Sequence, residues 1–345
     1  MLSYILKRLL LMVPTLLGAL TITFIVVQFV PGGPVEQIMA EAAAASGGGG
    51  DDGYRASRDI DKKQIEELKK LYGFDKPPLE RYLDMVSNFA RFELGKSFMQ
   101  NKEVWQLIKE KLPVSISLGL WTFLLSYLIS VPLGVAKAVR EGTRFDTLST
   151  LLVLIGYAIP GFVLGVLLIV MFAGGTFLDW FPLRGLTSDN WAELSWSGKI
   201  IDYFWHLALP LVCLTIGSFA VITMLTKNTF VEEIRKQYVL VARAKGLSQQ
   251  RVLYKHIFRN ALIPLVTGFP AAFVHAFFAG SVLIETLFSL DGLGLLGYEA
   301  VVRRDYPVVL GSLYFFTLIG LVVKLVSDLL YRVVDPRVQF GSVAK

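Results

Sequence analysis

The fold of this chain is decided by the stretch LALPLVCLTIGSFAVITML, residues 207–225, which carries no charged side chain. Such a run is typical of a transmembrane helix. We expect this span to end before Lys227, because a charge in hydrocarbon costs about 2.5 kcal/mol or more. Residues 227–259 then carry eight Lys or Arg and two acids, Glu232 and Glu233. By the positive-inside rule, this basic segment is predicted to lie in the cytoplasm.

Composition indicates a membrane protein independently of that stretch. The chain has 345 residues, of which 54% are hydrophobic and 18% charged, and its mean hydropathy is +0.56. A soluble domain with a charged surface does not show such values. The net charge of +6 does not indicate nucleic acid, because the cations cluster beside apolar runs. The single cysteine, Cys213, excludes an intrachain disulfide and a thiolate metal cluster.

Six apolar runs of roughly 20 residues are long enough to cross about 30 Å of hydrocarbon as helices. They cover residues 9–30, 115–135, 148–173, 207–225, 262–283 and 308–330. An even number places both termini on one side. Basic residues flank the first run, separate the second from the third and follow the sixth, whereas the other short loops are acid-rich. Both termini are therefore expected in the cytoplasm.

The first run resembles a secretory signal in one respect, because Lys7 and Arg8 precede its apolar part. It is long, however, and Pro31-Gly32-Gly33-Pro34 follows it without a clear small-residue cleavage site. We therefore expect a retained transmembrane helix.

A large outward-facing segment is predicted between the first two spans. Residues 40–59 contain four consecutive glycines and cannot bury a core, which predicts a mobile loop. Apolar side chains at helical spacing then predict three short amphipathic helices, near residues 65–72, 82–89 and 104–108. Such helices either cover a pore mouth or pack on the surface.

We divide the chain into three parts on this basis. Residues 1–112 comprise the first span and the outward segment, residues 113–335 the remaining transmembrane domain, and residues 336–345 a cytoplasmic tail. The predicted fold class is an all-α integral membrane protein with six transmembrane helices.

Several strings imitate catalytic or cofactor motifs. Gly292-Leu293-Gly294-Leu295-Leu296-Gly297 matches a dinucleotide fingerprint, but no strand is predicted before it and no acid follows at the required distance. Gly95-Lys96-Ser97 resembles the end of a phosphate-binding loop whose opening glycine is missing. The three histidines, residues 206, 256 and 275, lack metal-ligand spacing. We predict no catalytic, cofactor-binding or metal-binding residue.

Lys324 and Asp328 are the strongest candidates for charge inside the membrane. They lie four residues apart on one helical face and can neutralise each other. Either an ion pair anchors the end of the sixth span, or Asp328 belongs to a proton relay. The first alternative is favoured, because a lysine near a helix end extends its stem toward water.

A resemblance to a known family rests on motifs that extend along nearly the whole chain. Ala242-Arg243-Ala244-Lys245-Gly246, with His256, Arg259-Asn260-Ala261 and Pro264, resembles the cytoplasmic coupling loop of binding-protein-dependent ABC importer permeases of the dipeptide/oligopeptide class. Further matching motifs are Pro14-Thr15-Leu16-Leu17, Lys111-Leu112-Pro113, Pro132-Leu133-Gly134, Gly292-Leu293-Gly294, Arg304-Asp305-Tyr306-Pro307 and Asp335-Pro336-Arg337.

Within this class, three motifs and the Gly-rich insertion resemble the Yej-type permeases, which import microcin C and oligopeptides. The motifs are Tyr157-Ala158-Ile159-Pro160, residues 181–186 and Thr226-Lys227-Asn228. Two departures from the wider pattern stand out. Leu240 replaces the Glu of the general importer loop, and Lys324 occupies a position where relatives often carry a neutral polar residue.

The resemblance implies a type I importer fold with a periplasmic segment after the first helix, in the bacterial inner membrane. It implies four kinds of partner: a second homologous permease in a heterodimer, an ATPase with two nucleotide domains, a periplasmic peptide-binding protein and membrane lipid. ATP and Mg²⁺ are then bound by the ATPase and not by this chain. The residues implied in coupling are Tyr238, Ala242, Arg243, Ala244, Lys245, Gly246 and Leu247.

Residue chemistry gives each coupling position a reason. Gly246 lets the backbone turn, Ala242 and Ala244 keep the surface low enough to enter a groove, and Arg243 and Lys245 supply steering charge. An alternative is a basic helix that lies on anionic lipid. For the whole chain, an ion-coupled secondary transporter and a passive channel remain alternatives.

Overall fold

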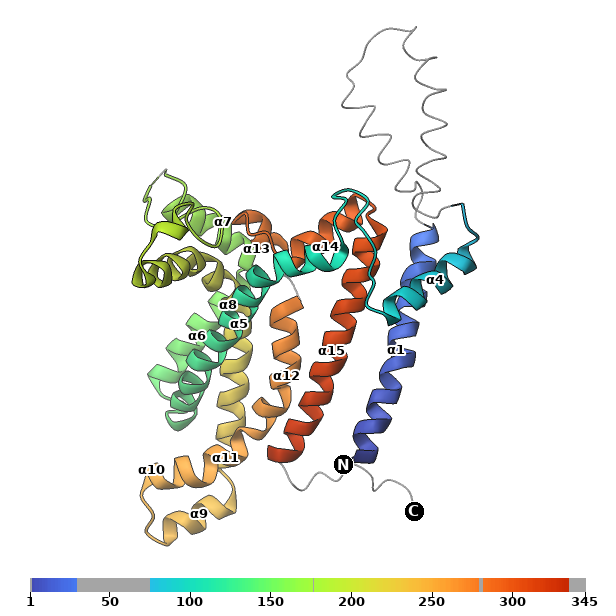
Figure 1. Ribbon diagram of the computed structural model, residues 1–345. Coiled ribbons are helices and arrows are strands. Elements are labelled where there is room, and N and C mark those ends of the chain that lie inside the picture. The colour runs from blue at the N-terminus through green and yellow to red at the C-terminus, as the bar shows by residue number, and fades with distance from the viewer. Residues whose placement is uncertain (1, 30–74, 176, 279–281, 335–345) are drawn as a thin grey trace. The chain divides into compact units, whose positions relative to one another are not determined.

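The computed structural model describes residues 2–29, 75–175, 177–278 and 282–334, which form helices and no β-strand (Figure 1). Within these ranges, eleven helices have six residues or more. They are α1 (Leu2–Phe29), α4 (Pro78–Ala90), α5 (Val104–Val139), α6 (Arg144–Ala158), α7 (Gly161–Phe172), α8 (Trp196–Ile234), α9 (Gln237–Ala244), α12 (Ile263–Phe278), α13 (Val282–Leu287), α14 (Leu293–Val302) and α15 (Tyr306–Val334). Short turns of helix are Trp191–Glu193, α10 (Gln249–Val252), the π-helical turn Leu253–Ile257 and α11 (Phe258–Ala261).

Among the described residues, four helices are long and apolar enough to cross a membrane: α1, α5, α8 and α15. They contain the first, second, fourth and sixth predicted runs. Helix α8 continues beyond the fourth predicted run, through Lys227 to Ile234. Its 39 residues extend roughly 58 Å, well beyond the hydrocarbon thickness.

The third predicted run is not one straight helix. Residues Arg144–Ala158 and Gly161–Phe172 form two helices that meet at a 91° bend. Pro160 precedes α7 and disfavours helical geometry at Ile159, which has an extended backbone with φ of −89° and ψ of 118°. The pair is either one broken span or a re-entrant loop.

The fifth predicted run is covered in part. Helix α12 ends at Phe278, and the described chain resumes at Val282, where the short helix α13 begins. The described residues therefore hold four candidate spans, or five if the bent pair is one span. A total of six remains a prediction.

The chain divides into two compact units, and the first comprises residues 1–111 and 296–321. Helix α4 confirms the amphipathic helix predicted near residues 82–89. The Tyr82 hydroxyl lies 2.6 Å from that of Thr21 in α1, and the Phe89 ring lies 5.2 Å from the Tyr314 ring in α15. The helix predicted near residues 104–108 is the start of α5, which begins at Val104 and continues unbroken to Val139.

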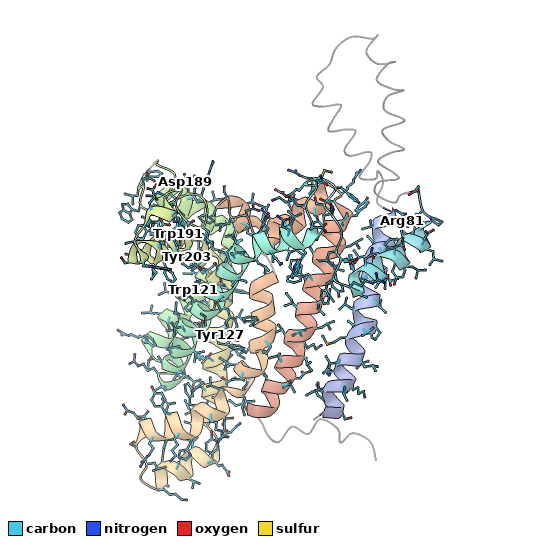
Figure 2. The ribbon with its side chains drawn as sticks, in the orientation of Figure 1. Arg81, Trp121, Tyr127, Asp189, Trp191 and Tyr203 are labelled. Atoms are coloured by element: carbon cyan, nitrogen blue, oxygen red, sulfur yellow. The ribbon has the colours of Figure 1, made fainter. Side chains whose placement is uncertain are left out.

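The second unit comprises residues 112–295 and 322–345. One apolar cluster joins α7, α8 and α13 and includes the buried Leu207, Leu211 and Phe288. Near it, Trp121 of α5 donates a 3.1 Å hydrogen bond to the hydroxyl of Tyr203 in α8 (Figure 2). A second apolar cluster joins α5, α8, α9 and α11.

Helices α5 and α8 approach closely at Gly134. A Cβ at this position would lie 2.5 Å from Cβ of Thr226 and 2.8 Å from the carbonyl oxygen of Thr223. Real Cβ atoms do not tolerate such contacts, so only glycine allows this packing. The motifs Pro132-Leu133-Gly134 and Thr226-Lys227-Asn228 therefore meet at one helix contact.

Some predictions lie outside the described residues. They concern the Gly-rich loop at 40–59, the helix near 65–72, Pro31-Gly32-Gly33-Pro34 and the tail at 336–345. Lys324 and Asp328 lie one turn apart on α15, and the choice between an anchoring pair and a proton relay stays open.

Candidate functional site

The sequence from α9 to α11 forms a compact turn of short helices beyond the end of α8 (Figure 1). Helix α9 ends at Ala244, and Gly246 follows it with a φ of +79°, a left-handed conformation. The Gly246 amide donates to the Arg243 carbonyl at 2.9 Å, and the Leu247 amide donates to the Ala242 carbonyl at 3.3 Å. This pair of bonds is a Schellman cap, which favours glycine at the left-handed position. The predicted turn at Gly246 is therefore confirmed.

The next short helix begins immediately after the cap. Ser248 is its N-cap, and its side chain accepts a 3.4 Å hydrogen bond from the Arg251 amide. The Schellman cap at Gly246 and the N-cap at Ser248 lie only two residues apart. The chain therefore turns sharply between α9 and α10. Residues 237–261, here named the α9–α11 segment, therefore form one folded projection.

The inward face of the α9–α11 segment is apolar. Val239, Ala242, Val252 and Ile257 are buried together with Phe230 of α8. Ala242 was expected on the outer surface, but only 8% of it is exposed. Its small side chain instead allows α9 to lie close to the segment's own core.

The outward face carries the remaining predicted residues. Arg243, Ala244, Lys245 and Gly246 are exposed, whereas Leu247 is half-buried against the apolar cluster. Three exposed apolar residues on the same segment were not predicted as site residues: Leu240, Val241 and Tyr254, which are 60%, 53% and 66% exposed. Leu240 could have been found, since it replaces a charged residue of the general importer pattern. The outward face is therefore apolar at several points and basic around them.

Tyr238 ties α9 to its neighbours. Its hydroxyl donates a 2.6 Å hydrogen bond to Glu233 of α8 and accepts a 3.3 Å bond from Asn260 of α11. Lys236 also pairs with Glu233. Burial raises the pKa of Tyr238 above its ordinary value, and the hydrogen bond to Glu233 raises this pKa further. The Asn260 contact gives Arg259-Asn260-Ala261 a structural role.

A buried charge cluster lies where α5, α6 and α8 converge. The Asp146 carboxylate of α6 is 2.7 Å from Nζ of Lys227 in α8 and 3.2 Å from Nζ of Lys137 in α5. Lys137 has a fully buried side chain and also donates to Ser149 and Thr150, at 2.8 and 2.6 Å. From the sequence alone, Lys137 indicates only a cytoplasmic loop.

The two misleading strings have structural roles. The Leu295 amide, in the string from Gly292 to Gly297, donates a 2.6 Å hydrogen bond to the fully buried Glu285. Ser97, from the incomplete phosphate-loop string, is buried and donates to Asp305, which also accepts from the Phe98 amide at 3.0 Å. Within the ranges that the structure describes, no group of three His, Cys, Asp or Glu could hold a metal ion.

Residues 130–340 match the family described as the binding-protein-dependent transport system inner membrane component, and the chain belongs to this family. It is 54% identical to the peptidoglycan transport system permease protein YejB of Agrobacterium fabrum, over 98% of both chains. It is 34% identical to the di/tripeptide transport system permease protein DppB of Pseudomonas aeruginosa, over 98% of this chain and 99% of the relative. The predicted resemblance to peptide permeases, and to the Yej type among them, is confirmed.

A solved structure shares the fold. The MetNI methionine ABC transporter, in an inward-facing conformation, matches with a TM-score of 0.50 at 19% identity, over 66% of this chain and 96% of that chain. The protein is therefore a multi-pass inner-membrane permease subunit of an ABC importer. As a permease subunit it is not itself the ATPase.

Proposed function

We propose that this permease carries peptides into the cell and that the outward face of the α9–α11 segment docks on the ATPase. The observation that carries the docking proposal is the exposure of Leu240, Val241 and Ala244 beside Arg243 and Lys245, on a segment whose other face is packed. Apolar contact gives a docking surface most of its affinity, and surrounding charge steers the encounter.

The proposed cargo follows from the relatives. One relative is named for peptidoglycan transport and another for di- and tripeptides. We infer that this chain carries oligopeptides, including microcin C-like peptides and peptide-bearing fragments of peptidoglycan. Direct uptake measurements with each of these classes decide among them.

The proposed topology has six spans with both termini in the cytoplasm. The charge bias of the loops supports it, as do the four long helices, the bent pair and α12. The segment after α1 then lies in the periplasm. The assembly proposed is a heterodimer with a homologous permease, an ATPase with two nucleotide domains that binds ATP and Mg²⁺, and a periplasmic peptide-binding protein.

The contacts within the second unit support a route for coupling. The α9–α11 segment is tied to α8 through Tyr238 and Glu233, and α8 is tied to α5 and α6 through Lys227 and Asp146. A push on α9 by the closing ATPase is therefore transmitted to three membrane helices together. ATP-driven closure then biases the permease between its inward-open and outward-open states.

The test is Ala244→Glu, because Ala244 is exposed and its replacement disturbs no packed side chain. Bulk and negative charge on the docking surface should lower peptide uptake at least tenfold in liposomes reconstituted with all partners. Ala90→Glu, at the exposed end of α4, is the matched control and should keep wild-type uptake. Uptake and peptide-stimulated ATPase near wild type in Ala244→Glu would show that the segment is not the docking site.

A further inference from the structure

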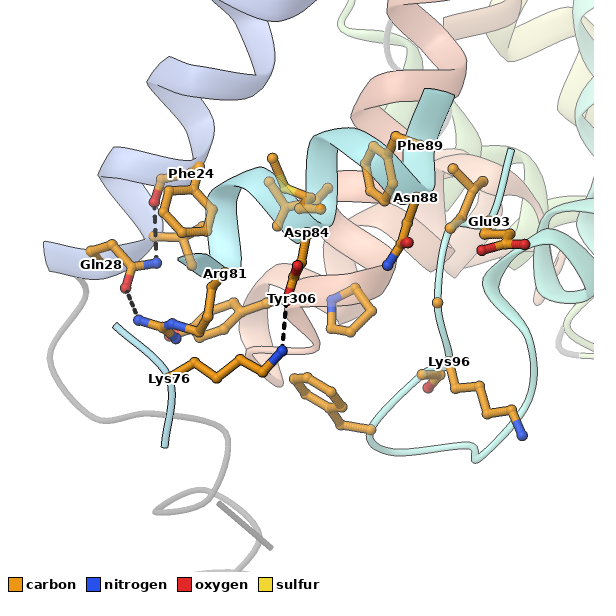
Figure 3. A pocket seen from close by; sticks show the side chains of 18 of the residues that line it. Phe24, Gln28, Lys76, Arg81, Asp84, Asn88, Phe89, Glu93, Lys96 and Tyr306 are labelled. Atoms are coloured by element: carbon orange, nitrogen blue, oxygen red, sulfur yellow. Dashed lines mark hydrogen bonds and ion pairs between the residues drawn. The ribbon is translucent and has the colours of Figure 1, made fainter. Parts of the chain in front are cut away.

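A cavity of about 720 Å³ lies in the first unit, between the end of α1, helix α4 and the start of α15 (Figure 3). Phe24 and Gln28 of α1 and Tyr306 of α15 contribute to its wall. Because α1 and α15 are long enough to cross the membrane, a cavity at their ends lies at the membrane boundary. Its volume is in the range of sites for small organic ligands.

The cavity wall carries charges of both signs. Figure 3 shows Arg81 and Lys76 on one side and Glu93 and Lys96 on the other. Arg81 donates a 2.6 Å hydrogen bond to Gln28, and Lys76 pairs with Asp84 at 2.7 Å. Among the described residues, Glu93 forms no ion pair. Partial burial lowers the pKa of Arg81, so its cation gains from an anion placed beside it.

The surroundings of the cavity are apolar and exposed. Leu79 and Leu83, one turn apart on α4, are 69% and 57% exposed, and Phe29 at the end of α1 is exposed as well. A helix with one packed face and an exposed apolar face is typical of the boundary between headgroups and acyl chains. A ligand with a polar head and apolar tails fits this arrangement better than a free peptide does.

We propose that this cavity binds the headgroup of a zwitterionic phospholipid that carries a primary ammonium, with its phosphate at Arg81 and Lys76 and its ammonium at Glu93. The acyl chains then lie along α1 and the exposed leucines of α4. A purely anionic headgroup fits less well, because it has no cation to place at Glu93. A choline headgroup has no N–H to donate to Glu93. This inference rests on the membrane location of the chain and is independent of its cargo.

The experiment is native mass spectrometry of the full-length permease with its co-purified subunits, in mild detergent. Equal amounts of phosphatidylethanolamine, phosphatidylcholine and phosphatidylglycerol with identical acyl chains compete for the protein. We expect the wild type to retain phosphatidylethanolamine about tenfold over phosphatidylcholine, because a hydrogen bond to a charged group is lost with choline. If the wild type retains phosphatidylethanolamine and phosphatidylcholine in a ratio near one, or retains phosphatidylglycerol equally well, the proposal is wrong. This outcome needs only the wild-type protein.

Two variants separate the parts of the headgroup. Glu93→Gln should reduce the preference for phosphatidylethanolamine to less than threefold, whereas Arg81→Gln should weaken both zwitterionic lipids alike. Glu110→Gln, an exposed carboxylate of α5 that pairs with Lys102 outside the cavity wall, is the matched control and should bind as the wild type does. An unchanged preference in Glu93→Gln contradicts the proposal. Displacement of the lipid by millimolar dialanine contradicts it too and assigns the cavity to peptide. Neither outcome depends on transport activity.

Discussion

Single residues set the shape of the α9–α11 segment. Gly246 closes the Schellman cap with a φ of +79° and has open space around it, so backbone conformation alone excludes a side chain there. Gly142, in the loop between α5 and α6, has the same two properties, with a φ of +75°. The pair allows backbone strain to be separated from a role in docking.

Gly246→Ala and Gly142→Ala should each lower stability by about 1–2 kcal/mol, the cost of a left-handed non-glycine residue. Only Gly246→Ala should also lower peptide uptake severalfold, because only its turn presents Arg243 to Lys245. Thermal unfolding and uptake in proteoliposomes measure the two effects. Equal uptake by both variants would argue against a docking role for the turn.

Tyr238→Phe removes the hydroxyl between Glu233 and Asn260. We expect a loss of about 1–3 kcal/mol, since a partly buried hydrogen bond to a charged group disappears. The raised pKa of Tyr238 means that the folded state holds this proton more tightly than the unfolded state. The stability that the Tyr238 hydroxyl contributes is therefore complete below its ordinary pKa near 10, and it is lost as the pH rises through the pKa of the folded state. Between pH 8 and 11, the free energy of unfolding should fall less steeply with pH in the variant than in the wild type. Parallel curves would show that the Tyr238 hydroxyl does not contribute stability in this way.

At the scale of elements, one carboxylate joins three helices. Asp146 of α6 contacts Lys137 of α5 and Lys227 of α8, and both lysines are largely or fully shielded from solvent. The same region of α5 and α6 is linked to α8 by a second pair, Arg235 and Glu141, which is exposed. Because one link is buried and the other is exposed, breaking them should change the free energy of unfolding by different amounts.

Asp146→Ala should destabilise the protein by about 3–5 kcal/mol, because it strands two buried ammonium groups. Glu141→Gln, which breaks the exposed pair, should cost less than about 1 kcal/mol. The midpoint of thermal unfolding in detergent compares the two, with insertion checked by membrane fractionation. A similar, small shift for both variants would mean that the cluster contributes little to holding the helices.

At the scale of the whole molecule, the proposed topology places residue 249 in the cytoplasm and residue 197 in the periplasm. Ser197→Cys and Gln249→Cys, each in a Cys213→Ser background, introduce one exposed thiol. A membrane-impermeant maleimide added to intact spheroplasts should label only position 197, and position 249 should label after permeabilisation. The background protein without cysteine is the control. Reversed labelling would invert the topology and remove the basis for cytoplasmic docking.

The sequence by itself determined the spanning helices α1, α5, α8 and α15, the family and the glycine stop at residue 246. These features follow from local rules. A transmembrane helix needs an uncharged run of set length, and a left-handed cap favours glycine, whatever the remaining chain does. The bend at Pro160 also follows from a local rule, because a proline disfavours helical geometry at the preceding residue, Ile159. The prediction of one continuous span did not take this rule into account.

Only the tertiary structure decided which surfaces meet. Lys227 of α8 is neutralised by Asp146, 81 positions away in sequence, and a cost per charge cannot include a partner that is not yet placed. Ala242 is buried because α9 packs on Phe230 and Ile257, which no periodicity within α9 specifies. The cavity beside Arg81 likewise exists only where α1, α4 and α15 come together. Hydropathy and backbone preference are properties of a segment, whereas burial and pairing are properties of contacts between segments.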